Sequence, residues 1–196
     1  LARMPQAAAE ADILVSNHWS AAYPPAPKVR LVQAVATGID LFDLAVPGWR
    51  PAVAAAPLAD AAPPHRLVAV LHGNINRPEE DCALWESAAR PHGWVLCPRG
   101  IPRTDLAPRH AVWTYADAGA ITRELEAGVS ALETRFPGAV RRDDAWLVGF
   151  SLGAILAAPV VRRSPLSFSA LILVEGGADV TDWTARTLAS RGVRTV

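Results

Sequence analysis

Residues 149–153 read Gly-Phe-Ser-Leu-Gly, a GxSxG sequence between an apolar run and a segment rich in small residues. A serine in this pattern sits on a sharp turn between a strand and a helix, so its hydroxyl projects above the sheet edge as a nucleophile. Gly149 and Gly153 leave room for the neighbouring strand and helix, and the helix N-terminus offers N–H donors to a developing negative charge. A coincidental match in an ordinary loop is the alternative, because the pattern fixes only three residue types.

A second feature lies upstream, where the apolar run 66–71 ends in His72-Gly73-Asn74. In the nucleophile-elbow architecture, a loop of this kind supplies the second backbone donor to the oxyanion. The two features stand in the order that this architecture requires. Together they favour hydrolysis by Ser151 over coincidence.

Predicted strands and helices alternate along the part of the chain that positions these residues. Four apolar runs without polar alternation predict strands covered on both faces of a parallel sheet, and a fifth begins at Val193. The four runs are residues 66–71, 94–97, 145–150 and 170–174. Helices are predicted from Pro78 towards Arg90, after Asp117 to Phe136, directly after Ser151, and over residues 182–190. The pattern predicts an α/β fold, a mostly parallel sheet with helices on both faces.

The segments VAVLHGN (68–74), VLCPRG (95–100) and WLVGFSLGA (146–154) resemble the α/β-hydrolase superfamily. Within it, the chain is similar to serine esterases of the carboxylesterase, lysophospholipase and dienelactone-hydrolase type, over about residues 66–192. The resemblance implies Ser151 as nucleophile and the backbone N–H groups of Leu152 and Asn74 as the oxyanion hole. It implies a supporting role for four residues of the turns: His72, Gly73, Gly149 and Gly153. The expected substrate is a small-molecule ester, with no metal and no organic cofactor.

The acid and the histidine of the superfamily follow the serine in sequence. Here all five histidines precede Ser151, so we expect a chain truncated at its C-terminus, with both partners in sequence beyond it. His110, Glu175 and Asp179 are weaker candidates, since a surface loop or a helix cap explains them better. Without a base the serine is a poor nucleophile, which leaves a non-catalytic, hydrolase-like binding module as the alternative function.

The organisation of the chain changes near residue 65. We expect a leading segment over residues 1–50 with two short strands, near 13–15 and 29–35. Residues 51–65 hold eleven Ala or Pro and predict a linker, and residues 66–196 form the incomplete hydrolase core. Residues 11–46 weakly resemble the start of D-isomer-specific 2-hydroxyacid dehydrogenases. The chain has no GxGxxG sequence, so a dehydrogenase fragment is the least favoured interpretation.

Composition excludes several classes of protein. The chain has 19 basic and 19 acidic residues, which gives no broad charged surface for nucleic acid. It has no apolar run long enough to span a membrane. Cys82 and Cys97 match no zinc, CxxC or disulfide framework, so they are predicted to be small buried hydrophobes in a reducing, cytoplasmic setting. The arginines at 99, 103 and 109 are expected to lie in a solvated loop rather than to bind an anionic substrate. The sequence does not indicate the oligomeric state.

Overall fold

The computed structural model describes residues 13–16, 31–34, 41–58, 63–106, 111–177 and 182–195. The chain divides into two compact units, residues 1–40 and 41–196. In the first unit β1 (Ile13–Ser16) pairs in parallel with β2 (Leu31–Ala34), so both strands predicted in the leading segment are present. Much of the dehydrogenase-like stretch lies outside the described residues.

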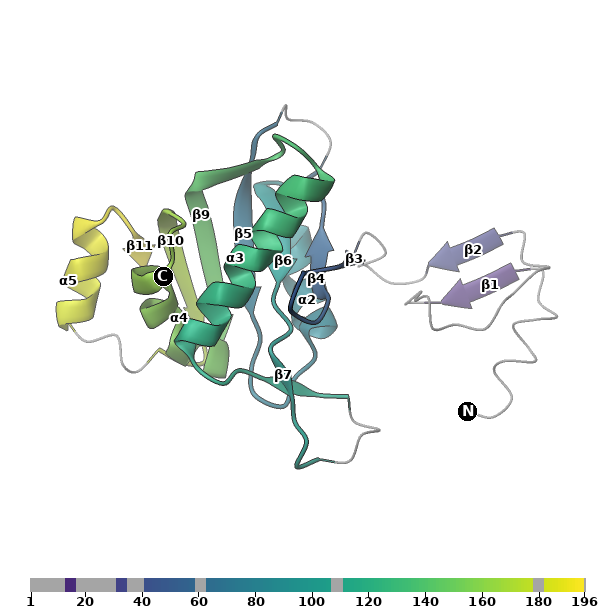
Figure 1. Ribbon diagram of the computed structural model, residues 1–196, viewed down its shortest axis with the longest axis horizontal. Helices are drawn as coiled ribbons and strands as arrows, with labels where there is room; N and C mark the ends of the chain where they lie inside the picture. Colours follow the sequence, from purple (N-terminus) through teal and green to yellow (C-terminus); the bar gives the residue numbers. More distant parts are fainter. Residues whose placement is uncertain are drawn as a thin grey trace. The chain divides into compact units, whose positions relative to one another are not determined.

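The second unit is built on a seven-stranded sheet, in the order β11-β10-β9-β5-β6-β4-β3 among the described residues (Figure 1). The strands are β3 (Leu41–Leu44), β4 (Ala52–Ala55), β5 (His65–Leu71), β6 (Gly93–Cys97), β9 (Val140–Phe150), β10 (Phe168–Val174) and β11 (Arg194–Thr195). β4 runs antiparallel to both of its neighbours, whereas the strands from β6 to β11 pair in parallel. The prediction of a mostly parallel sheet is confirmed.

Helices cover both faces of this sheet. They are α2 (Pro78–Ala89), α3 (Ala118–Arg135), α4 (Leu152–Arg163) and α5 (Asp182–Ser190). β5 shows why both faces are buried: Leu67, Ala69 and Leu71 pack in the cluster that holds α3 and α4, while Val68 and Val70 pack in the cluster that holds α2. None of the described helices is long and apolar enough to cross a bilayer.

The segment predicted as a linker contributes to the sheet. Residues 52–55 form β4, whose four side chains are all buried, and β4 pairs with β3 and β6. The linker interpretation is therefore wrong for these residues. The reason is that an Ala-rich segment has no hydrophobic periodicity, although its backbone N–H and C=O groups can still pair with neighbouring strands.

The prediction for the cysteines is also wrong in one respect. Cys82 of α2 and Cys97 of β6 are buried, as expected, but they form a disulfide with a Cα–Cα distance of 6.0 Å. The bridge fastens α2 to the sheet, a pairing that sequence spacing does not reveal. The cytoplasmic assignment rested on reduced cysteines and loses that support, because disulfides persist mainly in oxidising compartments.

The disulfide makes a first testable contribution to stability. Replacing both cysteines with alanine should lower the free energy of unfolding by about 3 kcal/mol, because the bridge closes a loop between positions 15 residues apart. Urea denaturation of the oxidised wild type and of the double variant measures this difference. Equal stability of the two proteins would show that the cross-link does not restrict the unfolded chain.

Candidate active site

Ser151 is the turn residue between β9 and α4. Its backbone angles are φ 51° and ψ −113°, a sparsely populated positive-φ conformation that costs a residue with a side chain about 1–3 kcal/mol. The backbone N–H of Ser151 donates to Val174 O of β10 at 2.9 Å, and Ser151 O accepts from Ile155 N at 3.0 Å. The Ser151 side chain makes no capping bond to α4. The hydroxyl is therefore left for other chemistry.

The two glycines of the GxSxG sequence are required by close backbone contacts. A Cβ on Gly149 would lie 2.7 Å from the backbone of Ala154 in α4. A Cβ on Gly153 would lie 2.3 Å from Leu71 O at the end of β5. Real Cβ atoms do not approach so closely, so both positions need glycine for the strand, turn and helix to pack.

The loop after β5 lies directly against this turn. A Cβ on Gly73 would lie 3.4 Å from Ser151 Cβ, which places the His72-Gly73-Asn74 loop beside the serine. The N–H of Leu152 belongs to the first turn of α4, where helices leave amides without an internal partner. Among the described residues, neither this N–H nor that of Asn74 donates to a backbone carbonyl of a turn, loop or cap. The structure thus brings the predicted oxyanion donors to the same edge as Ser151.

His72 is part of the scaffold. Its ring is buried, stacks on Tyr115 with centroids 4.3 Å apart, and faces two carbonyl oxygens: Nδ1 lies 2.7 Å from Gly73 O and Nε2 lies 3.0 Å from Arg99 O. Burial lowers the pKa of His72, so the ring is neutral near neutral pH. Both ring nitrogens face carbonyl oxygens of the loops after β5 and β6, of which the neutral ring can donate to one, so His72 belongs to the scaffold and is not placed as a base for Ser151.

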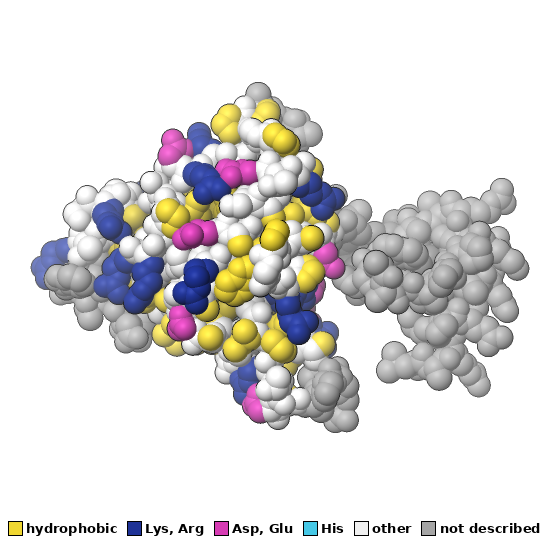
Figure 2. All heavy atoms as spheres, viewed as in Figure 1, with side chains coloured by type: hydrophobic (Ala, Val, Ile, Leu, Met, Phe, Trp, Pro, Cys, Tyr) yellow, Lys and Arg dark blue, Asp and Glu magenta, His cyan; other side chains and the backbone are white. Residues whose placement is uncertain are grey.

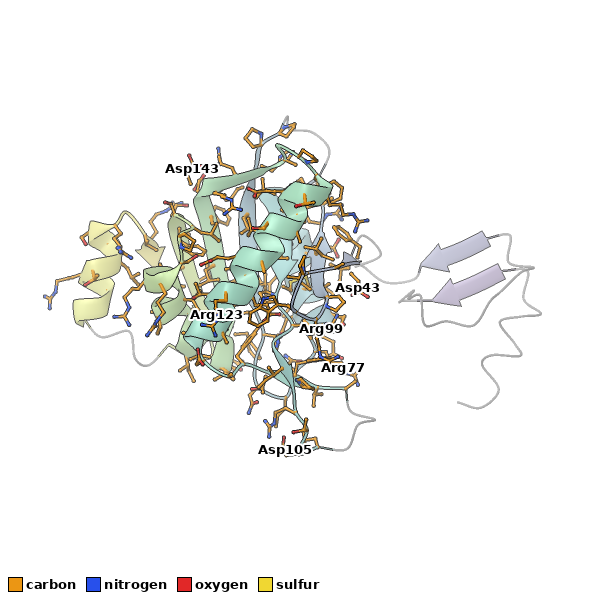
Figure 3. All side chains as sticks on the ribbon, viewed as in Figure 1. Asp43, Arg77, Arg99, Asp105, Arg123 and Asp143 are labelled. Atoms are coloured by element: carbon orange, nitrogen blue, oxygen red, sulfur yellow. A yellow bond between two sulfur atoms is a disulfide. The ribbon has the colours of Figure 1, made fainter. Side chains whose placement is uncertain are left out.

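The loop after β6 is fixed by a buried carboxylate. Glu124 of α3 accepts the N–H of Arg99 at 2.8 Å and of Gly100 at 3.0 Å, and burial raises its pKa. Arg99 is itself buried, donating from Nε to Pro51 O and pairing with Glu79 and Asp43 (Figure 3). Its charge is compensated by these carboxylates, so Arg99 holds the sheet edge together and does not face an anionic substrate.

Arg103 and the strand pair beyond β6 hold the Asn74 loop from outside. β7 (Ile101–Pro102) and β8 (Trp113–Thr114) form a small antiparallel pair, and Trp113 exchanges backbone hydrogen bonds with Asn76. Arg103 donates from Nη1 to Asn74 Oδ1 at 2.7 Å and makes a bidentate pair with Asp105, which lowers the pKa of Asp105 to about 2. Asp105 thus neutralises the charge of Arg103, and Arg103 positions the Asn74 side chain. Arg109 lies outside the described residues.

Asp81 of α2 supports the same loop from below. Its carboxylate accepts the Asn76 side-chain N–H at 2.8 Å. Asn76 stands two residues after Asn74, so this bond fixes the end of the loop that carries the Asn74 N–H. Burial raises the pKa of Asp81 to about 6.

This raised pKa predicts a pH dependence of stability. Between about pH 4 and pH 6 the folded protein binds more protons at Asp81 than the unfolded chain, whose ordinary pKa is 3.8. The contribution of Asp81 to stability therefore falls as pH rises through this window. Asp81→Asn should gain on the order of 1–2 kcal/mol relative to wild type between pH 4 and pH 7.5, a figure reduced for solvent screening. Urea unfolding at both pH values measures it, and an equal difference at the two would contradict it.

The described residues supply no histidine base at this edge. His65 begins β5, and His92 precedes β6 and stacks on Trp146, so both lie at the opposite ends of the strands from Ser151. Glu175 follows β10 directly after Val174, whose carbonyl holds Ser151 N. Glu175 is exposed and has a positive φ of 52°. His110 and Asp179 lie outside the described residues.

Sequence reasoning missed three supporting residues, Asp81, Tyr115 and Glu124. Asp81 lies in the first turn of α2, where the helix dipole alone favours an acidic residue, so the sequence gives no sign of its hydrogen bond to Asn76 in the preceding loop. Glu124 carried a usable signal, because it lies between Ile121 and Leu125 in the buried stripe of α3, and an acidic residue there must have partners. Tyr115 carried none, since its hydroxyl partners are backbone groups distant in sequence.

Comparison with known proteins supports the fold. No protein-family model matches the chain, and no curated protein matches its sequence. Among solved structures, the Bacillus cereus carboxylesterase superposes with a TM-score of 0.52 at 14% identity, covering 74% of this chain and 82% of that protein. A lipase in its open form (TM-score 0.48, 16% identity, 77% of this chain) and a bacterial heroin esterase (0.48, 18%, 69%) also match.

This chain spans 50% of that lipase and 44% of that heroin esterase. At these identities the matches speak to fold alone, and the carboxylesterase superposition carries that conclusion together with the strand order and the turn at Ser151. Residues 41–196 have the α/β-hydrolase fold.

Proposed function

We propose that this protein is a serine hydrolase that cleaves carboxylic esters through an acyl-enzyme on Ser151. The observation that carries the proposal is the strained turn at Ser151, whose hydroxyl caps no helix and whose two glycine neighbours are required by backbone contacts. Backbone strain at a residue with a reactive side chain is typical of functional sites. An ordinary strand-to-helix loop needs no such conformation.

The geometry supports a defined sequence of steps. Ser151 Oγ attacks the ester carbonyl, and the oxygen of the tetrahedral intermediate receives the N–H groups of Leu152 and Asn74. The intermediate collapses by releasing the alcohol, which takes up the proton that left Ser151, and water then hydrolyses the acyl-enzyme. Arg103 and Asp81 keep the Asn74 loop in place during both steps. The proton transfers need a general base, which the described residues do not supply.

A second candidate is a hydrolase-like module that binds an ester without cleaving it. The observation that favours it is that both His72 ring nitrogens face backbone carbonyl oxygens, while His65 and His92 lie at the far end of the sheet. Such a module would keep the turn and the oxyanion donors but would leave Ser151 unactivated.

Covalent labelling distinguishes the two candidates. An alkyl fluorophosphonate should add to Ser151 of the natural full-length protein, with loss of fluoride, and peptide mass spectrometry should locate the adduct. Ser151→Ala should remain unlabelled, whereas Ser190→Ala, which changes an exposed serine at the end of α5, should label as wild type does. An intact protein that never labels at Ser151 supports the binding module and contradicts the esterase.

A further inference from the structure

Three exposed isoleucines lie in segments that follow the strand ends at the edge of the sheet that carries Ser151. Among the described residues, five large hydrophobic side chains are exposed: Leu58, Ile75, Leu84, Ile101 and Ile155. The three isoleucines, with exposed fractions of 48%, 45% and 43%, all come from segments that begin at the carboxyl ends of β5, β6 and β9. Figure 2 shows hydrophobic side chains along the lower edge of the second unit, the edge at which these strands end in Figure 1.

Ile75 is held in an unfavourable conformation. It follows Asn74 in the loop beside Ser151, and its φ of 56° lies in the left-handed region, where a β-branched side chain is a genuine outlier. The backbone bonds between Asn76 and Trp113 hold the loop in this shape. Glycine or asparagine would satisfy the backbone at lower cost, so packing and folding do not explain an exposed isoleucine here.

Ile155 lies one helical turn beyond the serine. Residues four apart share one face of a helix, and Ile155 N donates to Ser151 O, which fixes this relation. Helical side chains lean towards the N-terminus, so the Ile155 side chain covers the surface over the turn that holds Ser151. Ile75 and Ile155 therefore flank the serine from two different elements.

We infer that Ile75 and Ile155, with Ile101 at the rim, bind the apolar acyl or alkyl portion of the substrate, so that the protein prefers esters with a medium-length hydrocarbon chain. The inference rests on the proposed function, because a carbonyl held between Ser151 and the Asn74 N–H places its substituents next to both isoleucines. Contact with a hydrocarbon chain removes apolar surface from water on both partners. The charged neighbour Arg103 is neutralised by Asp105 and offers no competing anion site.

A chain-length series tests the inference. The ratio of kcat/KM for p-nitrophenyl octanoate to that for p-nitrophenyl acetate should be well above one in the natural full-length protein. Ile75→Gly and Ile155→Ala should each lower this ratio about 3- to 10-fold, mainly through the KM for the octanoate. Leu84→Ala is the matched control for Ile155→Ala, because it truncates an exposed aliphatic residue on the helix α2 and should leave the ratio unchanged.

A second readout separates a binding role from a structural one. Because glycine tolerates positive φ, Ile75→Gly should raise the Tm by a few degrees while weakening octanoate hydrolysis. A lower Tm with equal losses for both esters would overturn the inference and leave the esterase proposal standing. If the isoleucine variants keep the wild-type octanoate-to-acetate ratio but no longer bind phosphatidylcholine vesicles, the isoleucines contact a lipid surface. That result would also overturn the inference. If no ester is cleaved and Ser151 never labels, the proposed function fails, and the inference fails with it.

Discussion

Replacing Ser151 with alanine should reduce kcat/KM for carboxylic esters by at least about 1,000-fold in the natural full-length protein. The loss should fall on kcat, because the alanine variant keeps the Leu152 and Asn74 N–H groups and the apolar contacts that bind the ester. The fold should survive, since the Ser151 side chain makes no capping bond and the backbone bonds of the turn do not depend on it. Steady-state kinetics with p-nitrophenyl butyrate measure the effect.

Two controls make this experiment decisive. Ser190→Ala removes an exposed hydroxyl far along the chain and should leave kcat/KM at the wild-type value. Thermal unfolding of Ser151→Ala should give a Tm within a few degrees of wild type, which excludes general loss of structure. A variant that folds and retains its turnover would show that another group attacks the ester, and the acyl-enzyme on Ser151 would have to be abandoned.

The elements that the sequence predicts correctly are those whose signal is local. β5, β6 and β10 are short, continuously apolar runs, and the start of α3 is marked by Asp117, whose side chain accepts the N–H of Ala120. β4 escaped prediction because its alanines carry no periodicity and because its buried environment is created by β3 and β6, which lie far from it in sequence.

The same distinction holds for the candidate site. The GxSxG sequence predicts a turn at Ser151 because strand, turn and helix are consecutive in the chain, and the structure has that turn. The hydrogen bonds that fix the Asn74 loop come from Asp81 and Arg103, and no sequence pattern relates these residues to the loop. The disulfide is a further example, since its two cysteines meet only when α2 packs on the sheet beside β6. Predictions from sequence therefore locate the turn at Ser151 better than the residues that support it.

The supports explain why the site tolerates unfavourable backbone angles. Ile75, Ser151 and Glu175 each have a positive φ, and each belongs to one of three segments that converge on the same sheet edge. Backbone hydrogen bonds across this edge, from Ser151 to Val174 and from Asn76 to Trp113, restrain the segments against relaxation. Local strain persists where surrounding contacts over-determine the conformation, which is the situation here.

Replacing Gly153 with alanine should be among the most destabilising single methyl additions in the protein, costing more than about 3 kcal/mol of unfolding free energy. The new Cβ would lie 2.3 Å from Leu71 O and 2.8 Å from His72 O, so either α4 or the end of β5 must move. Because Ser151 directly precedes α4 and the Asn74 loop follows β5, we expect esterase activity to fall even in molecules that remain folded. Urea denaturation and ester hydrolysis measure the two effects.

Gly138→Ala is the control. Gly138 has a positive φ of 72° but no neighbour within 4 Å, so this variant should lose only about 1 kcal/mol of unfolding free energy and keep its activity. Gly153 lies inside α4 and has no positive φ, so its need for glycine comes from the contact alone; destabilisation no larger than that of Gly138→Ala would show that α4 and the end of β5 separate at little cost.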